Sequence, residues 1–245
     1  MASKRVEVVG LIERPRAPAY ARFMGQLVII VSGLFLFALG VVLTLRSGLG
    51  LGPWDVLHQG ISRHTPLTFG QASQVVGVAV IGIGLALRVR PGLGAVLNML
   101  LIGFFVDRLV AVHMIPLAAP YGLLAQLGMD AGGVLLVGLG SGLYIRAKLG
   151  AGPRDGLMLG LHRVTGVRVA MTRAALEVTV AIAGFLLGGT VGIGTLVFAL
   201  GVGPAVELGF RMFGVPSRAG PTPTRQGETG RRAGRPVEDY HGIER

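Results

Sequence analysis

The stretch GLGLGPWDVL, residues 48–57, decides the fold, because the chain repeats it one hundred residues later as KLGAGPRDGL, residues 148–157. Both copies keep a Gly-x-Gly-Pro-x-Asp pattern. Between residues 39–65 and 139–165, 13 of 27 positions are identical, where composition alone would give about three, and such fixed-period similarity is typical of a duplicated unit. Shared membrane composition does not place Pro53, Asp55 and Thr65 in register, so the sequence predicts a duplication.

Long uncharged blocks surround the motif, in a chain that is 51% hydrophobic and only 14% charged. Residues 23–45 and 69–87 carry no charge, and each is long enough for a bilayer core, which needs about 20 apolar residues per helix. The weaker candidate spans are 92–112, 123–145, 169–188 and 191–210. We therefore predict an all-α membrane protein with about six transmembrane helices in two three-helix repeats.

An odd number of spans in each repeat means that the second repeat enters the membrane from the opposite side, so we expect the repeats to be inverted. The positions of the basic residues agree with this. With the N-terminus in the cytoplasm, 20 of the 23 Lys and Arg residues fall in cytoplasmic segments, as the positive-inside rule requires. The predicted topology is multi-pass, with both termini inside.

The predicted organisation has five parts. They are a basic cytoplasmic tail (1–22), membrane repeat one (23–112), a linker (113–122), membrane repeat two (123–213) and a disordered basic cytoplasmic tail (214–245). The net charge of +11 lies largely in these flanks. Basic flanks of spans hold orientation and meet anionic lipid head groups, so we expect the bilayer, and not nucleic acid, as the partner.

The doubled motif predicts a break followed by a short helix in each repeat. Glycine frees the backbone, and proline cannot continue a preceding helix but suits the first turn of a new one. The short helices, 53–63 and 153–163, would span about 16 Å, half a bilayer. Each either lies on the surface or enters the membrane as a re-entrant half-helix. The residues of this structural motif are Gly50, Gly52, Pro53, Gly150, Gly152 and Pro153.

Asp55 and Asp155 fall near the third position of the short helices, where a carboxylate meets the positive end of the helix dipole. They either only cap interfacial helices or form part of a substrate or ion site. Inverted repeats would bring the two acids together, and two unpaired carboxylates would need a proton, a cation or basic partners. Arg46 and Arg146, each nine residues earlier, are the expected partners.

Other acids of the membrane domain are weaker candidates. Glu177 lies within a predicted span, where ionisable residues are costly and often functional. The alternative is a purely structural ion pair with Arg173, one turn earlier. Asp107 and Asp130 are expected at the outer membrane interface. Asp55 and His58 share a helix face, but two ligands do not make a metal site.

No catalytic or cofactor motif is present in the sequence, and the chain has no cysteine. Nucleophile elbows, P-loops, zinc-protease motifs and dinucleotide fingerprints are all missing. We therefore expect no catalytic residues, no metal, no cofactor and no enzyme activity.

The motif region resembles the YczE/YyaS/YitT family of bacterial integral membrane proteins, most closely the YczE type. The resemblance covers about residues 23–212 and rests on the doubled motif and on residues 90–98 between its copies. It implies a multi-pass protein of the bacterial inner membrane, and the family has no settled activity. Trp54 stands where the second copy has Arg154, so the two units are not equivalent.

Three functions fit these features. The first is a transporter or permease-like protein, with a site for a small solute or ion at the repeat interface. The second is a non-transporting accessory or scaffold protein for a biosynthetic or export complex. The third, a membrane enzyme acting on lipid, lacks a nucleophile–base pair. No protein partner or oligomeric state is predicted.

Overall fold

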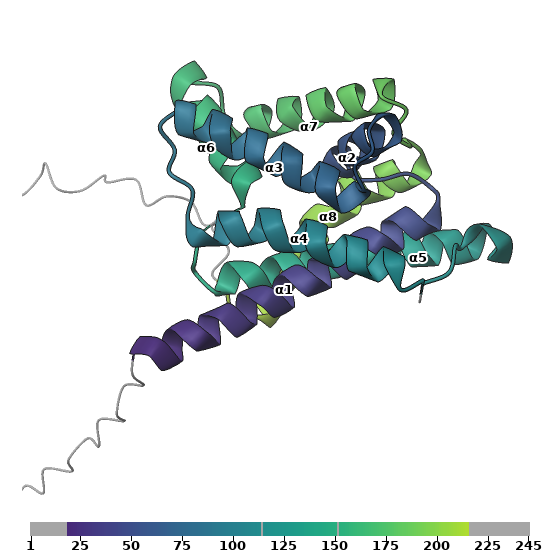
Figure 1. The fold of residues 1–245 in the computed structure, drawn as a ribbon, viewed down its shortest axis with the longest axis horizontal. Coiled ribbons are helices and arrows are strands. Elements are labelled where there is room, and N and C mark those ends of the chain that lie inside the picture. Colours follow the sequence, from purple (N-terminus) through teal and green to yellow (C-terminus); the bar gives the residue numbers. More distant parts are fainter. Residues whose placement is uncertain (1–18, 114, 151, 216–245) are drawn as a thin grey trace, which may run out of the picture.

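The computed structural model describes residues 19–113, 115–150 and 152–215, and every regular element in these ranges is helical (Figure 1). In chain order the elements are α1 (Ala19–Ser47), α2 (Pro53–His64), α3 (Phe69–Ala86), α4 (Leu93–Ala111), the 3-10 helix η1 (Ala119–Tyr121), α5 (Leu123–Arg146), α6 (Pro153–Thr165), α7 (Val169–Leu186) and α8 (Ile193–Met212). The expected all-α fold is confirmed. The two predicted tails lie mostly outside the described residues, although α1 already begins at Ala19.

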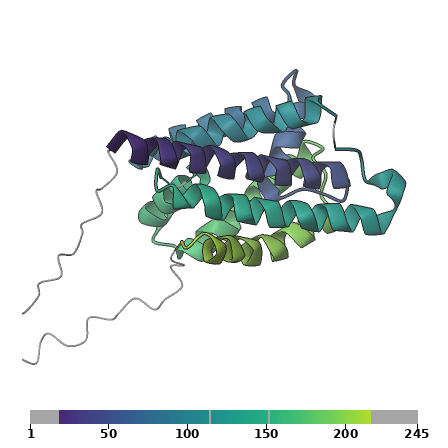
Figure 2. The ribbon, with the colours of Figure 1, turned by 90° about the horizontal axis from the view of Figure 1, so that it is seen from below.

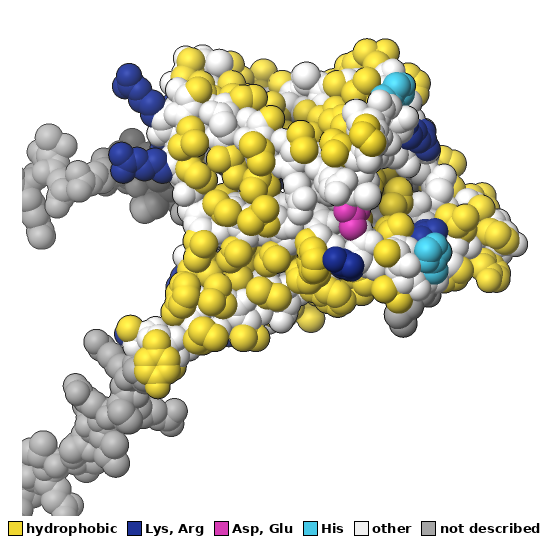
Figure 3. All heavy atoms as spheres, in the orientation of Figure 1, with side chains coloured by type: hydrophobic (Ala, Val, Ile, Leu, Met, Phe, Trp, Pro, Cys, Tyr) yellow, Lys and Arg dark blue, Asp and Glu magenta, His cyan; other side chains and the backbone are white. Residues whose placement is uncertain are grey.

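Six helices are long and apolar enough to cross a membrane: α1, α3, α4, α5, α7 and α8. They contain between 18 and 29 residues, and at 1.5 Å per residue about 20 residues cover a hydrocarbon core of roughly 30 Å. Hydrophobic side chains also spread over much of the surface (Figure 3), which suits a protein surrounded by lipid. The six predicted spans are therefore confirmed.

Helices α2 and α6 have only 12 and 13 residues, too few to cross a bilayer core. Each starts after an extended glycine, Gly52 or Gly152, with proline as the next residue. Two residues before these, Gly50 has φ 124° and Gly150 has φ 117°, a backbone region that favours glycine because it has no Cβ. The doubled pattern thus produces the same break twice.

The helices form two layers. In one layer α4, α1, α5 and α8 lie side by side (Figures 1 and 2). The other layer contains α2, α3, α6 and α7, with α2 packed on α7 and α6 packed on α3 (Figure 1). Glycines allow the central helices α1 and α5 to approach closely: an added Cβ on Gly40 would lie 2.6 Å from the carbonyl oxygen of Gly133. Small residues serve this purpose in membrane helix packing.

The two halves of the chain exchange backbone hydrogen bonds at equivalent positions. The amide of Gly94 donates to the carbonyl of Leu149 at 2.7 Å, and the amide of Gly194 donates to the carbonyl of Leu49 at 2.9 Å. Donor and acceptor are each shifted by one hundred residues between the two bonds. The contacts of α2 with α7 and of α6 with α3 are crossed in the same way. Crossed contacts between equivalent surfaces are typical of a two-fold arrangement.

Candidate functional site

A cavity of about 180 Å³ lies where the first turns of α2 and α6 meet. The two turns are in direct contact, because the guanidinium carbon of Arg154 in α6 lies 4.7 Å from the centre of the Trp54 ring in α2. All of the other α-helices contribute to the wall. Both copies of the doubled motif therefore face one space.

Most of the cavity wall consists of residue pairs that lie one hundred positions apart in the sequence. The pairs at the first turns of α2 and α6 and on the facing helices include Gly52 and Gly152, Pro53 and Pro153, Trp54 and Arg154, Asp55 and Asp155, Ser73 and Arg173, and Gly77 and Glu177. The cavity thus belongs to neither half alone and lies between them.

The second half supplies most of the charge in the cavity. Its charged lining residues are Arg154, Asp155, Arg173 and Glu177. The side chain of Arg173 donates to Oε1 of Glu177 at 3.0 Å, so Glu177 has the partner that the sequence offered as an alternative, and the pair faces the cavity. The cavity wall therefore carries charges of both signs.

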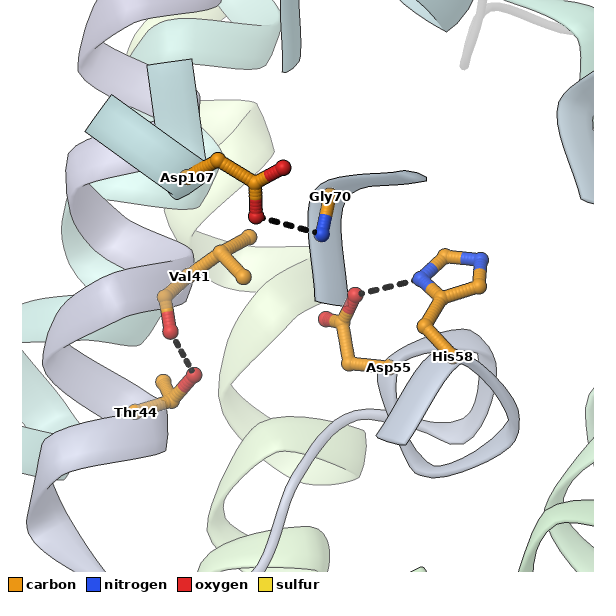
Figure 4. A network of polar contacts seen from close by, with 6 residues as sticks. All are labelled: Val41, Thr44, Asp55, His58, Gly70 and Asp107. Carbon is orange, nitrogen blue, oxygen red and sulfur yellow. Dashed lines mark hydrogen bonds and ion pairs between the residues drawn. The ribbon is translucent and has the colours of Figure 1, made fainter. Parts of the chain in front are cut away.

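In the first half, Asp55 lies beside His58 (Figure 4). Nδ1 of His58 is 3.3 Å from Oδ1 of Asp55, and the His58 side chain is 2% exposed. Burial lowers the pKa of His58 below its ordinary value of 6.5, and the neighbouring Asp55 only partly opposes this. The imidazole is therefore neutral at neutral pH. Within the described ranges, no group of three or more His, Asp or Glu side chains gathers to hold a metal.

Asp155 occupies the equivalent place in the second half. Burial raises the pKa of its carboxyl group, and the guanidinium groups of Arg173 and Arg154 oppose this shift. A buried carboxyl group resists ionisation because the charged form loses its hydration. Asp155 therefore holds a proton more firmly than an exposed aspartate does.

The expected partners of the motif aspartates, Arg46 and Arg146, lie elsewhere. Nη2 of Arg46 donates to the carbonyl of Val110 at 3.4 Å, and Arg146 is exposed at the end of α5. Neither arginine lines the cavity. In the part of the chain that the structure describes, no ion pair joins either of them to a motif aspartate. The positive charge near those aspartates comes from α6 and α7 instead.

Two further acidic residues, Asp107 and Asp130, contact neighbouring helices and do not line the cavity. Asp107 accepts hydrogen bonds from the amide of Gly70 at 2.8 Å (Figure 4) and from the hydroxyl of Thr68, so it holds the first turn of α3. Asp130 is fully buried and in contact with Ser47. Neighbouring helices cover it, because α1 and α8 pack against α5, and its place at the outer membrane interface stays a prediction.

The two sides of the cavity differ. A second hollow of about 320 Å³ adjoins it and shares Val80, Gly152 and Pro153 with it. This hollow lies among α3, α6 and the start of α4, with Arg90 and Gly150 on its wall. We call this region, between α6 and the C-terminal part of α3, the open end.

The equivalent region between α2 and α7 has a polar network across it. Arg63 donates to the carbonyl of Gly188 and to Oγ1 of Thr190, the latter at 3.2 Å. The amide of Thr190 donates to Oε1 of Gln59 at 2.6 Å. We call this region the closed end. The residues at the equivalent positions of the open end are Arg163, Arg88, Arg90 and Leu159.

Sequence reasoning did not assign Arg154 or Arg173 to the site. A signal was nevertheless present, because each is the charged member of a pair whose other member, Trp54 or Ser73, is uncharged. Departures from the repeat, as well as agreements with it, therefore mark this cavity.

Comparisons with known proteins agree with the predicted resemblance. A family of unknown function (DUF6198) matches residues 24–210. An uncharacterized protein of Haemophilus influenzae is 38% identical over 179 residues, which cover 73% of this chain and 80% of that protein. The uncharacterized membrane protein YczE of Bacillus subtilis is 39% identical over 171 residues, covering 69% of this chain and 78% of YczE. The uncharacterized protein YyaS of Bacillus subtilis is 29% identical over 167 residues, covering 67% and 82%. No solved structure gives a significant match.

Proposed function

The chain belongs to the DUF6198 family of unknown function, and we propose that it is a permease-like transporter whose substrate site is the cavity between its two halves. One observation carries this proposal: both copies of the doubled motif line a single cavity of about 180 Å³ with charged side chains in its wall. Broken helices at matching positions of inverted repeats are the usual pointer to the central site of a secondary transporter.

The proposal includes an inverted arrangement of the repeats, residues 23–112 and 123–213, joined by the linker 113–122. The crossed hydrogen bonds of Gly94 and Gly194 support it, and so does the charge distribution along the sequence. In this arrangement the protein lies in the bacterial inner membrane with both termini in the cytoplasm. The basic tails then meet anionic lipid head groups.

We further propose that α2 and α6 are re-entrant half-helices that enter from opposite faces. The contact between Trp54 and Arg154 supports this, because it joins their first turns. Their later turns pack near the ends of different spans: an added Cβ on Gly60 would lie 2.7 Å from Cβ of Leu187, and one on Gly160 would lie 3.0 Å from Cβ of Leu87. Two positive helix ends would then point into the cavity.

The proposed substrate is a small solute that carries charged groups of both signs. Among the hydrogen bonds and ion pairs of the described residues, none involves Arg154, so its guanidinium donors are available to an anionic group. Asp155 on the same turn can face a cationic group. The ring of Trp54 supports the guanidinium from one side, an arrangement that suits arginine.

The proposed topology puts the open end on the cytoplasmic side and the closed end outside. The hollow that adjoins the cavity then forms the route from the cytoplasm, and the network of Arg63, Gln59 and Thr190 blocks the outer route. We infer an inward-open state of an alternating-access cycle, in which the two ends exchange roles.

The natural chain lacks cysteine, so Met158→Cys introduces one unique thiol into the cavity wall. A membrane-impermeant maleimide should label it faster from the cytoplasmic face than from the outer face of oriented vesicles. Amino acids, organic acids and amines are then tested for protection of this thiol. Val164→Cys, at the exposed end of α6, is the control and should be labelled regardless of solute.

A protecting solute should also enter proteoliposomes that contain the protein, and Asp155→Asn and Arg154→Gln should each slow that uptake at least tenfold. A tenfold change corresponds to about 1.4 kcal/mol, the scale of one hydrogen bond to a charged group. Absence of protection of the Met158→Cys thiol by all three solute classes would contradict transport. The accessory function predicts that outcome, and under it Asp155→Asn and Arg154→Gln would weaken only the binding of a partner protein.

A further inference from the structure

A second buried acid lies apart from the cavity. Asp130, on α5, is 0% exposed and lies where α5 meets the end of α1 and the start of α8. The α8 backbone is close: an added Cβ on Gly194 would lie 3.0 Å from Oδ1 of Asp130. Asp130 does not line the cavity described above, so it requires its own explanation.

The contacts of Ser47, the last residue of α1, define the protonation of this acid. A serine hydroxyl has one hydrogen and two lone pairs. Oγ of Ser47 lies 2.7 Å from the carbonyl oxygen of Thr44, accepts a hydrogen bond from the amide of Leu49 at 3.2 Å, and lies 3.2 Å from Oδ1 of Asp130. The carbonyl of Thr44 can only accept, and it is the nearer oxygen, so it takes the hydroxyl hydrogen. A hydrogen between Ser47 and Asp130 then has to come from Asp130.

The surroundings of Asp130 also disfavour a negative charge. The titratable side chains on the elements around it are Arg46 on α1, Tyr121 on η1, and Glu207 and Arg211 on α8. Tyr20 and Arg22 of α1 and Tyr144 and Arg146 of α5 lie at the far ends of those two helices. Arg46 donates toward α4, and Glu207 and Arg211 pair with each other at 2.6 Å. Within the described residues, Asp130 has no ion pair and its Oδ2 has no hydrogen-bond partner. An ionised carboxylate without a partner is strongly disfavoured at such a place.

We propose that Asp130 is a proton-binding site, where a neutral carboxyl group donates its proton to Ser47. A metal ion would need several ligands, whereas within the described residues no group of three or more His, Asp or Glu side chains forms around Asp130. The backbone of Gly194 also lies close beside it. Ser47 directly precedes the break at residues 48–52, so the hydrogen bond from Asp130 to Ser47 holds α5 against the segment that links α1 to α2. Release of the proton leaves an unpaired negative charge beside the start of α8. The contact among α1, α5 and α8 must therefore open before the proton can leave.

Infrared spectroscopy of the purified protein in lipid at pH 7 tests this proposal. The spectrum of the wild type minus that of Asp130→Asn should contain the C=O band of a protonated carboxyl group, and the band should shift in D2O. Asp107→Asn is the matched control, because Asp107 accepts two hydrogen bonds as a carboxylate, and it should leave that band in place. A difference spectrum with only ionised carboxylate bands would overturn the proposal.

Ser47→Ala provides a second test, which also serves if Asp130→Asn does not fold. Removal of the acceptor should shift the carboxyl C=O band to higher frequency, and an unchanged band would contradict the assignment. Both measurements need no substrate. A failure of the transport proposal therefore leaves this one standing, and a failure here leaves the transport proposal standing.

Discussion

The closed end and the open end occupy equivalent places in the two halves, yet they are packed differently. At the closed end, an added Cβ on Gly184 of α7 would lie 2.4 Å from the amide nitrogen of Leu57 in α2. At the open end, an added Cβ on the equivalent Gly84 of α3 would meet no atom within 4 Å. The two copies of the motif therefore build similar helix arrangements, but their ends are packed with different tightness.

The largest expected effect tests this difference in packing. Gly184→Ala should lower the free energy of unfolding by about 2 kcal/mol, because its Cβ meets backbone, and overpacking of a tight contact typically costs about 1–3 kcal/mol. Gly84→Ala should be neutral or stabilise α3 by up to about 1 kcal/mol, the helix preference of alanine over glycine. Thermal unfolding followed by circular dichroism measures both. Equal losses in the two variants would show that the ends are packed alike.

The next effect concerns the polar network. Arg63→Gln removes the donor to Gly188 and Thr190, so the closed end should open more often. Labelling of Met158→Cys from the outer face should then rise about five- to tenfold, which corresponds to about 1 kcal/mol. Arg163→Gln, the equivalent change at the open end, should leave that rate unchanged. A similar rise in both variants would mean that Arg63 does not hold the closed end.

A smaller effect is expected where α3 and α4 meet. Asp107→Asn should cost about 1 kcal/mol of stability, because the side chain accepts two hydrogen bonds at the N-terminus of α3. Among the described residues, its equivalent Glu207 pairs with Arg211 at an exposed site, so Glu207→Gln should change stability by less than about 0.5 kcal/mol. Denaturation midpoints measure both losses of stability. A larger loss for Glu207→Gln than for Asp107→Asn would contradict this prediction.

The smallest effect is a pH dependence that comes from His58 of α2, whose equivalent in α6 is Met158. The pKa of His58 is lowered by burial below 6.5, so below pH 6.5 the unfolded chain binds a proton that the folded chain resists. Stability should therefore fall as the pH drops below 6.5, by less than the roughly 1.4 kcal/mol per pH unit of one full proton. His58→Met, which copies Met158 of α6, should weaken this fall. An identical pH profile in wild type and variant would exclude His58 as the cause.

Much of the architecture follows from local patterns that the sequence displays directly. Long uncharged blocks predict the spans, and Gly52 followed by Pro53 predicts a break whose second copy appears at the same spacing. These features depend on neighbours in the sequence, because the backbone freedom of glycine and the missing amide of proline act within one turn. For this reason the short helices begin where the motif places them.

The contacts between side chains could not be predicted from the sequence in the same way. Arg46 recurs at a fixed distance from Asp55, yet it points toward α4, because the break turns the chain between the two residues. Asp130 lies near one end of a span in the sequence, but it is fully buried, because Gly194 lets the start of α8 come close to it. Both outcomes depend on how helices cross in space, which a single sequence with 41 glycines does not specify.

The contact of Trp54 with Arg154 has a consequence for the history of such proteins. If the halves are inverted copies, two separate copies of one three-helix unit, assembled about a two-fold axis as a homodimer, would place identical residues against each other at this point. Two arginines would repel, and two tryptophans would supply no charge. Fusion of the copies into one gene frees each position to mutate on its own, so a ring can face a cation. Splitting the chain within 113–122 and expressing the pieces together should therefore restore the protein, whereas either piece paired only with itself should not.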